Sequence, residues 1–171
     1  MSVKKKEKIT GPSAWKGKDL KDDDSWIYHW SDESIRVLEK ALENVKQKGL
    51  QVPDFTKEDF PITELSEEIA YFNDELEDGR GFIVIRGLPI ERYTDDEAAI
   101  IYYGLGLHMG TPVPQNLKGD MLGHVRNIGA IDPKSVRVYE TNEYLPYQAD
   151  LSDVVGLLSP RKAKSGGMSS L

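Results

Sequence analysis

The sequence predicts an α+β fold in which helices pack on an antiparallel sheet. Two helical patterns come first along the chain, over residues 31–49 and 63–79, and short β-branched runs dominate after residue 120. Strand follows strand there, without the crossover helices that a parallel sheet needs. A doubly wound fold is therefore the less favoured alternative. The chain has 171 residues, enough for one domain with a core of its own.

Apolar residues at three- and four-residue spacing predict the two early helices. The first begins at Ser31, and Gly49 can supply its left-handed stop. The second begins near Thr63, and Gly79 is expected to stop it in the same way. The two predicted core-facing stripes consist of Ile35, Leu38, Leu42 and Val45 in the first helix and of Leu65, Ile69, Phe72 and Leu76 in the second.

The hydrophobic period then changes from helical to extended. The run "GFIVIRGLPI" at residues 81–90 predicts a strand buried on both faces. Thr94 and Glu97 form a capping box, which predicts a third helix to about Leu105. A rigid Pro-rich loop, "GTPVPQN", follows. The remaining predicted strands are "GHVRNIG", "VRVYETN" and the start of "DVVGLLSPRKAKSGG", whose end reads as a basic turn.

Composition divides the chain and excludes several functions. Residues 1–25 are polar and predict a flexible N-terminal arm before a domain at 26–171. The net charge of −7 argues against nucleic acid as a partner. No apolar run reaches the roughly 18 residues that span a bilayer, so no membrane partner is expected. The absence of cysteine excludes thiolate chemistry. No secretory segment precedes the domain, which makes the cytoplasm the default location.

Three motifs together resemble one enzyme family. They are "GFIVIRGLPI", then "GTPVPQN" with "GHVRNIG", then "LPYQADLSDVVGLLSPRKAKSGG". In order and spacing, over about residues 80–171, they resemble the taurine-dioxygenase-like (TauD/TfdA) family of Fe(II)- and 2-oxoglutarate-dependent oxygenases. The resemblance implies a double-stranded β-helix, or jelly roll. This chain would carry it in incomplete form, with the helices packed on part of it.

The resemblance also implies an iron site built from a His-x-Asp pair and a distant second His. Residues i and i+2 of a strand project to the same side, so two such ligands can face one metal ion. Here the pair reads Gln148-x-Asp150. Asp150 is thus the predicted metal ligand, and Gln148 stands where the family has His. An amide oxygen is a weaker and harder donor than imidazole, so we expect Fe(II) affinity to fall.

Further site residues follow from the same resemblance. Ser169 matches the hydroxyl position that contacts the 2-oxoglutarate. Gln115 and Asn116 match a loop beside the active site, where amides can orient a substrate; capping of the loop by the same amides is an equal alternative. His124 is a candidate for the substrate pocket, although a structural role is favoured. No residue matches the family's distal His or the Arg that grips the oxoacid.

The other polar candidates have structural interpretations. His29 is expected to be a packed or surface residue, and His108 to lie at a helix end, where the dipole favours a cation. Arg161, Lys162 and Lys164 are typical of a solvated hairpin tip, with attraction of an anionic ligand as the alternative. Asp153 is expected to be a turn residue or a support for the metal ligands.

These observations leave two functional hypotheses. The first is the N-terminal part of a dioxygenase that oxidises a small organic substrate, without turnover by this chain in isolation. The second is a non-catalytic binding or assembly protein that completes its sheet with a partner or a second copy, because bare strand edges invite pairing. A gene fragment without a role of its own is a third possibility.

Overall fold

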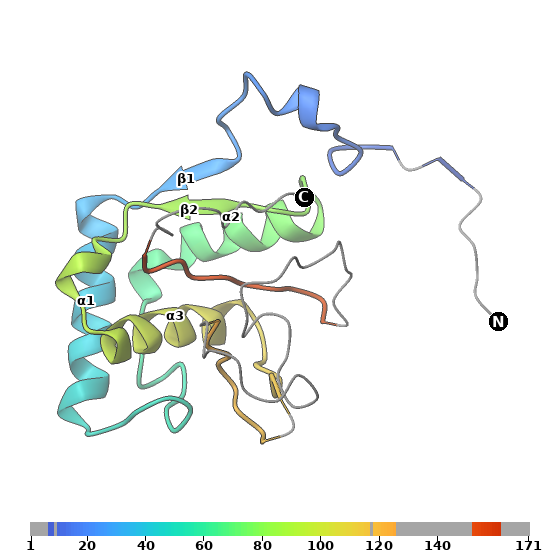
Figure 1. The fold of residues 1–171 in the computed structure, drawn as a ribbon. Helices are drawn as coiled ribbons and strands as arrows, with labels where there is room; N and C mark the ends of the chain where they lie inside the picture. The colour runs from blue at the N-terminus through green and yellow to red at the C-terminus, as the bar shows by residue number, and fades with distance from the viewer. Residues whose placement is uncertain (1–6, 9, 117, 126–151, 162–171) are drawn as a thin grey trace.

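The computed structural model describes residues 7–8, 10–116, 118–125 and 152–161 (Figure 1). Within them, three α-helices accompany a small sheet of two strands, which is consistent with part of an α+β domain. In chain order the main elements are β1 (Ile27–His29), α1 (Asp32–Gln47), α2 (Ser66–Glu77), β2 (Val84–Arg86) and α3 (Asp95–Met109). Short 3-10 turns are η1 (Gly17–Asp19), η2 (Thr63–Leu65) and η3 (Ile90–Arg92).

The sheet of the described residues is a parallel pair, which the sequence did not predict. The antiparallel prediction concerned strands after residue 120, most of which lie outside the described residues, so it stays a prediction. Ile27 pairs with Val84 and His29 with Arg86 in the same direction. A strand, β1, precedes the first helix, and α1 and α2 form the crossover that carries the chain back to the start of the sheet. That connection is the requirement for parallel pairing. This pair was not predicted because the sequence patterns indicated only the second of its two strands.

The run at residues 81–90 contributes a shorter strand than predicted. Only Val84–Arg86 pair, and β2 is half-buried with Arg86 exposed, so burial on both faces was wrong. β2 has one neighbour among the described strands, and only one of its faces lies on the helices. Gly87, at φ 96°, ends the strand against the backbone of Trp30, where a Cβ would lie 3.5 Å from the Trp30 carbonyl oxygen.

The first helix begins where the sequence predicted, because its cap is local. The second helical segment begins at Thr63 with the turn η2, and α2 follows from Ser66 without a side-chain cap. The Ser31 hydroxyl accepts the amide of Ser34 at 3.0 Å and caps α1. Gly49 has φ 68°, as a left-handed stop requires. Gly79 does not adopt a left-handed conformation, which corrects the prediction for α2. It must be glycine for another reason, since a Cβ there would lie 2.7 Å from the Cα of Glu75.

The third helix is longer than predicted. Thr94 and Glu97 form the capping box, with Glu97 N donating to Thr94 Oγ1 at 3.2 Å and Thr94 N to Glu97 Oε2 at 2.9 Å. The helix continues past Leu105 to Met109. Two glycines lower the helix propensity of this stretch, yet tertiary contacts keep it helical. Gly104 is buried against the Phe60 ring, where no larger residue fits.

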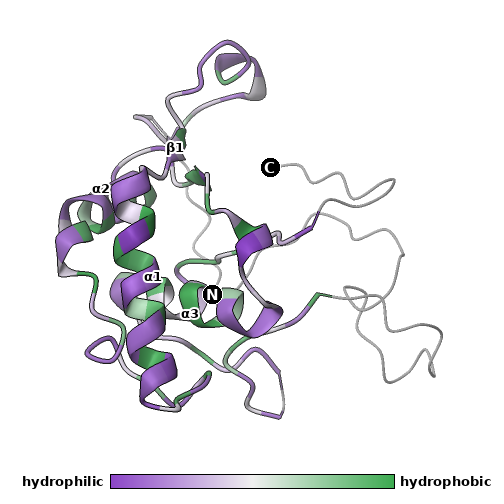
Figure 2. Cartoon of the chain, turned by 90° about the vertical axis from the view of Figure 1, so that its left-hand side faces the viewer, coloured by the Kyte–Doolittle hydropathy of each residue, from purple (hydrophilic) through white to green (hydrophobic). Residues whose placement is uncertain are grey.

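The core lies between the three helices and the inner side of the sheet. Figure 2 shows α1 with a mostly hydrophilic outer face, while the stripe predicted from its sequence is buried. Phe72 of α2 is fully buried and meets the rings of Tyr28 at 4.9 Å and Trp30 at 5.6 Å between centroids. The largest fully buried side chains are Phe60, Phe72, Leu38, Ile62, Ile101 and Val45.

The chain after α3 is less regular than predicted. The Pro-rich segment 110–116 is non-helical, as expected. Residues 153–158 form no strand, which corrects the prediction for "DVVGLL", because they have no paired strand in the described part of the chain. Residues 123–125 of "GHVRNIG" are also not in a strand, and its remainder and "VRVYETN" lie outside the described residues. No described helix has the length and apolarity to cross a bilayer.

Candidate functional site

The loop after α3 is built by its own side-chain amides. Asn116 Oδ1 accepts the amides of Lys118 at 2.9 Å and Asp120 at 3.3 Å, while its Nδ2 donates to Asp120 Oδ2 at 2.7 Å. Gln115 Nε2 donates to the Val113 carbonyl at 2.8 Å. These are the capping interactions that the sequence left open as an alternative. A role for Gln115 and Asn116 in binding substrate stays a prediction.

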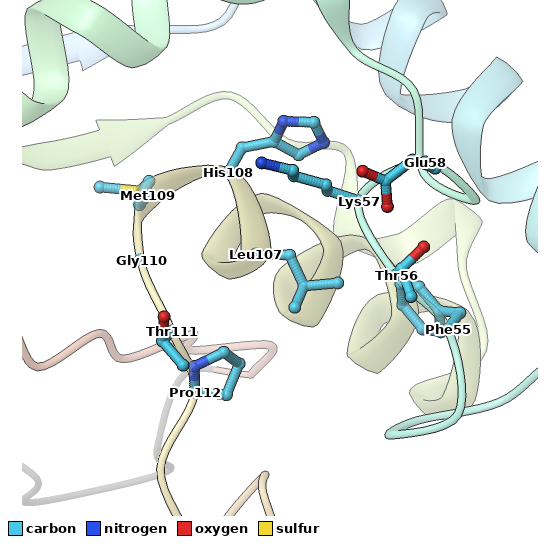
Figure 3. Close-up of a pocket in the computed structure, with 10 residues that line it drawn as sticks. All are labelled: Phe55, Thr56, Lys57, Glu58, Leu107, His108, Met109, Gly110, Thr111 and Pro112. Carbon is cyan, nitrogen blue, oxygen red and sulfur yellow. The ribbon is translucent and has the colours of Figure 1, made fainter.

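A cavity lies where this loop leaves the C-terminal end of α3. Its volume is about 540 Å³, within the range of small-molecule pockets. Figure 3 shows the segment 55–58 on one side and residues 107–112 on the other, with Lys57 and Glu58 directed toward the His108 ring. The lining combines apolar side chains with the opposite charges of Lys57 and Glu58. The lining residues are Phe55, Thr56, Lys57, Glu58, Leu107, His108, Met109, Gly110, Thr111 and Pro112.

His108 is held at the edge of this cavity. Its Nε2 atom lies 2.7 Å from the Phe60 carbonyl oxygen, which fixes a donor N–H on that nitrogen and leaves Nδ1 as the second ring position. The contact joins the last turn of α3 to the end of the segment 55–60. It agrees with the structural interpretation of a histidine at a helix end.

The carboxylate of Asp59 organises the segment on the other side of the cavity. It accepts the amide of Thr56 at 3.0 Å, and the Lys48 ammonium lies 2.7 Å from its other oxygen. The hydrogen bond from Lys48 is the largest influence, and with the Thr56 amide it lowers the pKa of Asp59 to about 2. This segment lies outside the sequence motifs that resemble the family. The pattern Thr56-x-x-Asp59 could have indicated it, because an Asp at this spacing can accept a backbone amide through its side chain.

We expect Asp59 to make the protein acid-sensitive in one pH window. Because its folded-state pKa lies below the ordinary value of about 3.9, its contribution to stability is complete above that value and is lost as pH falls to about 2. In urea unfolding between these pH values, Asp59→Asn should flatten the decline of the unfolding free energy. Asp96→Asn, an exposed carboxylate in α3, is the control. Equal slopes in the wild type and Asp59→Asn would contradict the assignment.

The segment 152–161 lies beside α3. Arg161 Nη2 is 3.2 Å from Asp95 Oδ1, and a Cβ on Gly156 would lie 2.7 Å from the Tyr102 hydroxyl. Burial of Tyr102 raises the pKa of its phenol. The exposed Arg161 is therefore paired with a carboxylate. The two apolar side chains Val155 and Leu157 are 52% and 84% exposed.

The predicted metal and cosubstrate residues lie outside the described part of the chain. These are Gln148, Asp150 and Ser169, so their predicted roles remain predictions. His124 is described and exposed at the end of the loop. Among the described residues, no group of three or more His, Asp or Glu side chains could hold a metal ion.

Comparison with a family model covers the sequence motifs within the described residues and those outside them. Residues 46–171 match the model of the taurine catabolism dioxygenase TauD, TfdA family. The chain belongs to the TauD/TfdA family. The match includes α2, β2, α3, the cavity and the Gln148-x-Asp150 pair, whereas β1 and most of α1 precede it. The resemblance inferred from the sequence motifs is thus confirmed.

Two relatives of this TauD/TfdA-family chain extend the similarity to its N-terminal residues. The FR-33289 synthase of Streptomyces rubellomurinus is 34% identical over 165 residues, which cover 95% of this chain and 48% of the synthase. The taurine hydroxylase-like protein SAT17 of Stachybotrys chartarum is 22% identical over 174 residues, covering 97% of this chain and 45% of that protein. The chain spans about half the length of the curated relatives it matches.

Proposed function

We propose that this chain supplies the first half of an Fe(II)- and 2-oxoglutarate-dependent dioxygenase that oxidises a small organic molecule. The family match across residues 46–171 carries the proposal. By resemblance, Gln148 and Asp150 would stand at the family's proximal ligand pair, and their position inside the matched range supports this assignment. The iron and the oxoacid would supply the oxidising chemistry, and the protein would position the substrate and exclude side reactions. We include in this proposal the jelly-roll fold that the family resemblance implies.

We further propose that the polypeptide 1–171 by itself does not assemble a complete iron site. No residue of the sequence matches the family's second His, and the proximal position carries the weaker amide donor. Asp150 is then the principal ligand that this half contributes. Substrate selection is assigned to the loop with Gln115, Asn116 and His124, close to the cavity at the end of α3.

Anaerobic titration with Fe(II) tests the assignment of the ligand pair. Gln148→His should raise Fe(II) affinity at least about tenfold, because imidazole is the better ligand for this ion. Asp150→Asn should abolish the binding that remains in the wild type. Asp96→Asn removes an exposed carboxylate elsewhere and should change nothing. If Gln148→His leaves Fe(II) affinity unaltered, residue 148 does not face a metal.

Addition of 2-oxoglutarate to the same samples separates the two parts of the proposal. The polypeptide 1–171 should give neither the coloured ternary complex nor decarboxylation of the oxoacid, with His or Gln at position 148. A coloured complex in the wild type would support the oxygenase function and overturn the claim that the site is incomplete.

Assembly without catalysis is the second candidate function. It is favoured by the exposed apolar side chains after α3, which are Val113, Val125, Val154, Val155 and Leu157. Extended chain with such side chains is suited to pairing with a second copy. Light scattering that finds a stable dimer with no affinity for Fe(II) would favour this candidate. A monomer that binds Fe(II) through Asp150 would favour the oxygenase.

A further inference from the structure

The segment 15–25 is attached to the start of β2 at two points. The first point is aromatic. The indole N–H of Trp15 donates to the Arg80 carbonyl at 3.0 Å, and its ring meets Phe82 edge-on at 5.1 Å. Trp26 packs on the same Phe82 ring at 5.8 Å. Phe82 therefore lies between two tryptophans that come from the N-terminal side of β1.

The second point is ionic and centres on Arg80. Its guanidinium lies 3.5 Å from the Asp23 carboxylate and 3.0 Å from the Glu75 carboxylate of α2. It also donates to the Ser25 hydroxyl. The Arg80 side chain is 23% exposed, so its charge is partly shielded from water and depends on these partners. Hydrogen bonds from Ser25, and then from Arg80, hold the pKa of Asp23 below its ordinary value.

These contacts support a sheet that is weak by itself. β1 and β2 are three residues long and have no further partner strand among the described residues, and an isolated strand pair is marginally stable. Beside these contacts, the buried indole N–H of Trp26 has no acceptor in the described structure. The attachment of segment 15–25 thus rests on aromatic packing and a few ionic contacts, and an unpaired buried donor lies beside it. A segment held in this way can open locally while the rest of the chain stays folded.

We propose that residues 15–25 form a clasp that closes on β2 through Arg80 and Phe82 and opens as ionic strength rises. The clasp precedes the family match, which begins at residue 46, while Arg80 and Phe82 lie within it. Opening frees Trp15 and uncovers Phe82, and it removes the support of β1 on the strand that leads into α3. The proposal is independent of the metal site and of the proposed oxygenase function.

Limited proteolysis of the full chain tests the clasp. Trypsin can cut after Lys16, Lys18 and Lys21, which lie within it, and mass spectrometry follows these cuts separately from all others. Raising the salt from about 0.05 to 0.5 M, which shortens the screening length several-fold, should speed cleavage of the wild type at these lysines. Arg80→Ala should speed it at least about tenfold at low salt and remove the salt dependence, while Arg80→Lys should fall between.

Two further variants distinguish the clasp from general destabilisation. Trp15→Phe keeps an aromatic ring beside Phe82 but loses the hydrogen bond to the Arg80 carbonyl. It should accelerate cleavage at the three lysines, and the cleavage should still depend on salt because Arg80 is present. Arg92→Ala removes an exposed ion pair with Glu39 and should leave cleavage unchanged. The clasp is overturned if Arg80→Ala is cut at the wild-type rate, if salt has no effect on the wild type, or if Arg92→Ala is cut as fast as Arg80→Ala.

Discussion

Phe72→Ala should cost about 3–5 kcal/mol of unfolding free energy, the largest effect expected of a single substitution in this chain. The ring is fully buried and is surrounded by Tyr28, Trp30 and Tyr71. Its removal leaves a cavity and also ends edge-to-face contacts worth more than their buried area. Since small domains are stable by only about 5–15 kcal/mol, the variant should approach the limit of folding.

Urea and thermal unfolding measure this loss. The melting temperature should fall by roughly 10 °C for a chain of this length. Tyr71→Ala is the matched control, because Tyr71 is the adjacent residue of α2 and is 37% exposed. It should cost only about 1 kcal/mol. Equal losses in the two variants would mean that Phe72 is not the centre of the core.

Gly104→Ala should destabilise the protein although alanine favours helices. A Cβ at this position would lie 2.5 Å from two carbons of the Phe60 ring, which is fully buried and has no room to retreat. Overpacking of this kind costs about 1–3 kcal/mol. The result also bears on the cavity, because the Phe60 carbonyl holds His108.

Gly106→Ala is the matched comparison, with the same chemical change two residues along α3. Nothing lies within 4 Å of its Cβ position, so the helix propensity of alanine should stabilise the protein by up to about 1 kcal/mol. We therefore expect the unfolding free energies of the two variants to move in opposite directions. Two stabilised variants would show that the Phe60 ring can shift at little cost.

The two glycines of α3 illustrate which parts of the fold can be predicted from sequence. Features set by neighbouring residues were predicted, and features set by distant contacts were not. Caps at Ser31 and Thr94 depend on neighbours in sequence, and their helices began as predicted. The end of α3 and the role of Gly79 depend on contacts with Phe60 and with the backbone of Glu75. Such contacts leave no periodic signal. The parallel pairing of β1 with β2 was missed because β1 is too short to show alternation.

For the candidate site, motif order identified the family, while geometry required the folded chain. The Pro-rich loop was predicted from composition, yet the choice of Asn116 as its organising residue emerged only from its three hydrogen bonds. The opposite wall of the cavity comes from residues 55–58, which precede the motifs that resemble the family. A wall made by a segment distant in sequence cannot be found from the spacing of residues in one motif.

The parallel pairing of β1 and β2 also orders the events of folding. The strands are joined across both α1 and α2, so their meeting closes a long loop whose entropy must be offset first. The helices nucleate from local contacts, and the strands can meet only when these have collapsed on one another. Interactions formed so late retard unfolding more than they accelerate folding. We therefore expect the pairing of β1 with β2 to form last among the contacts of the described residues and to open first.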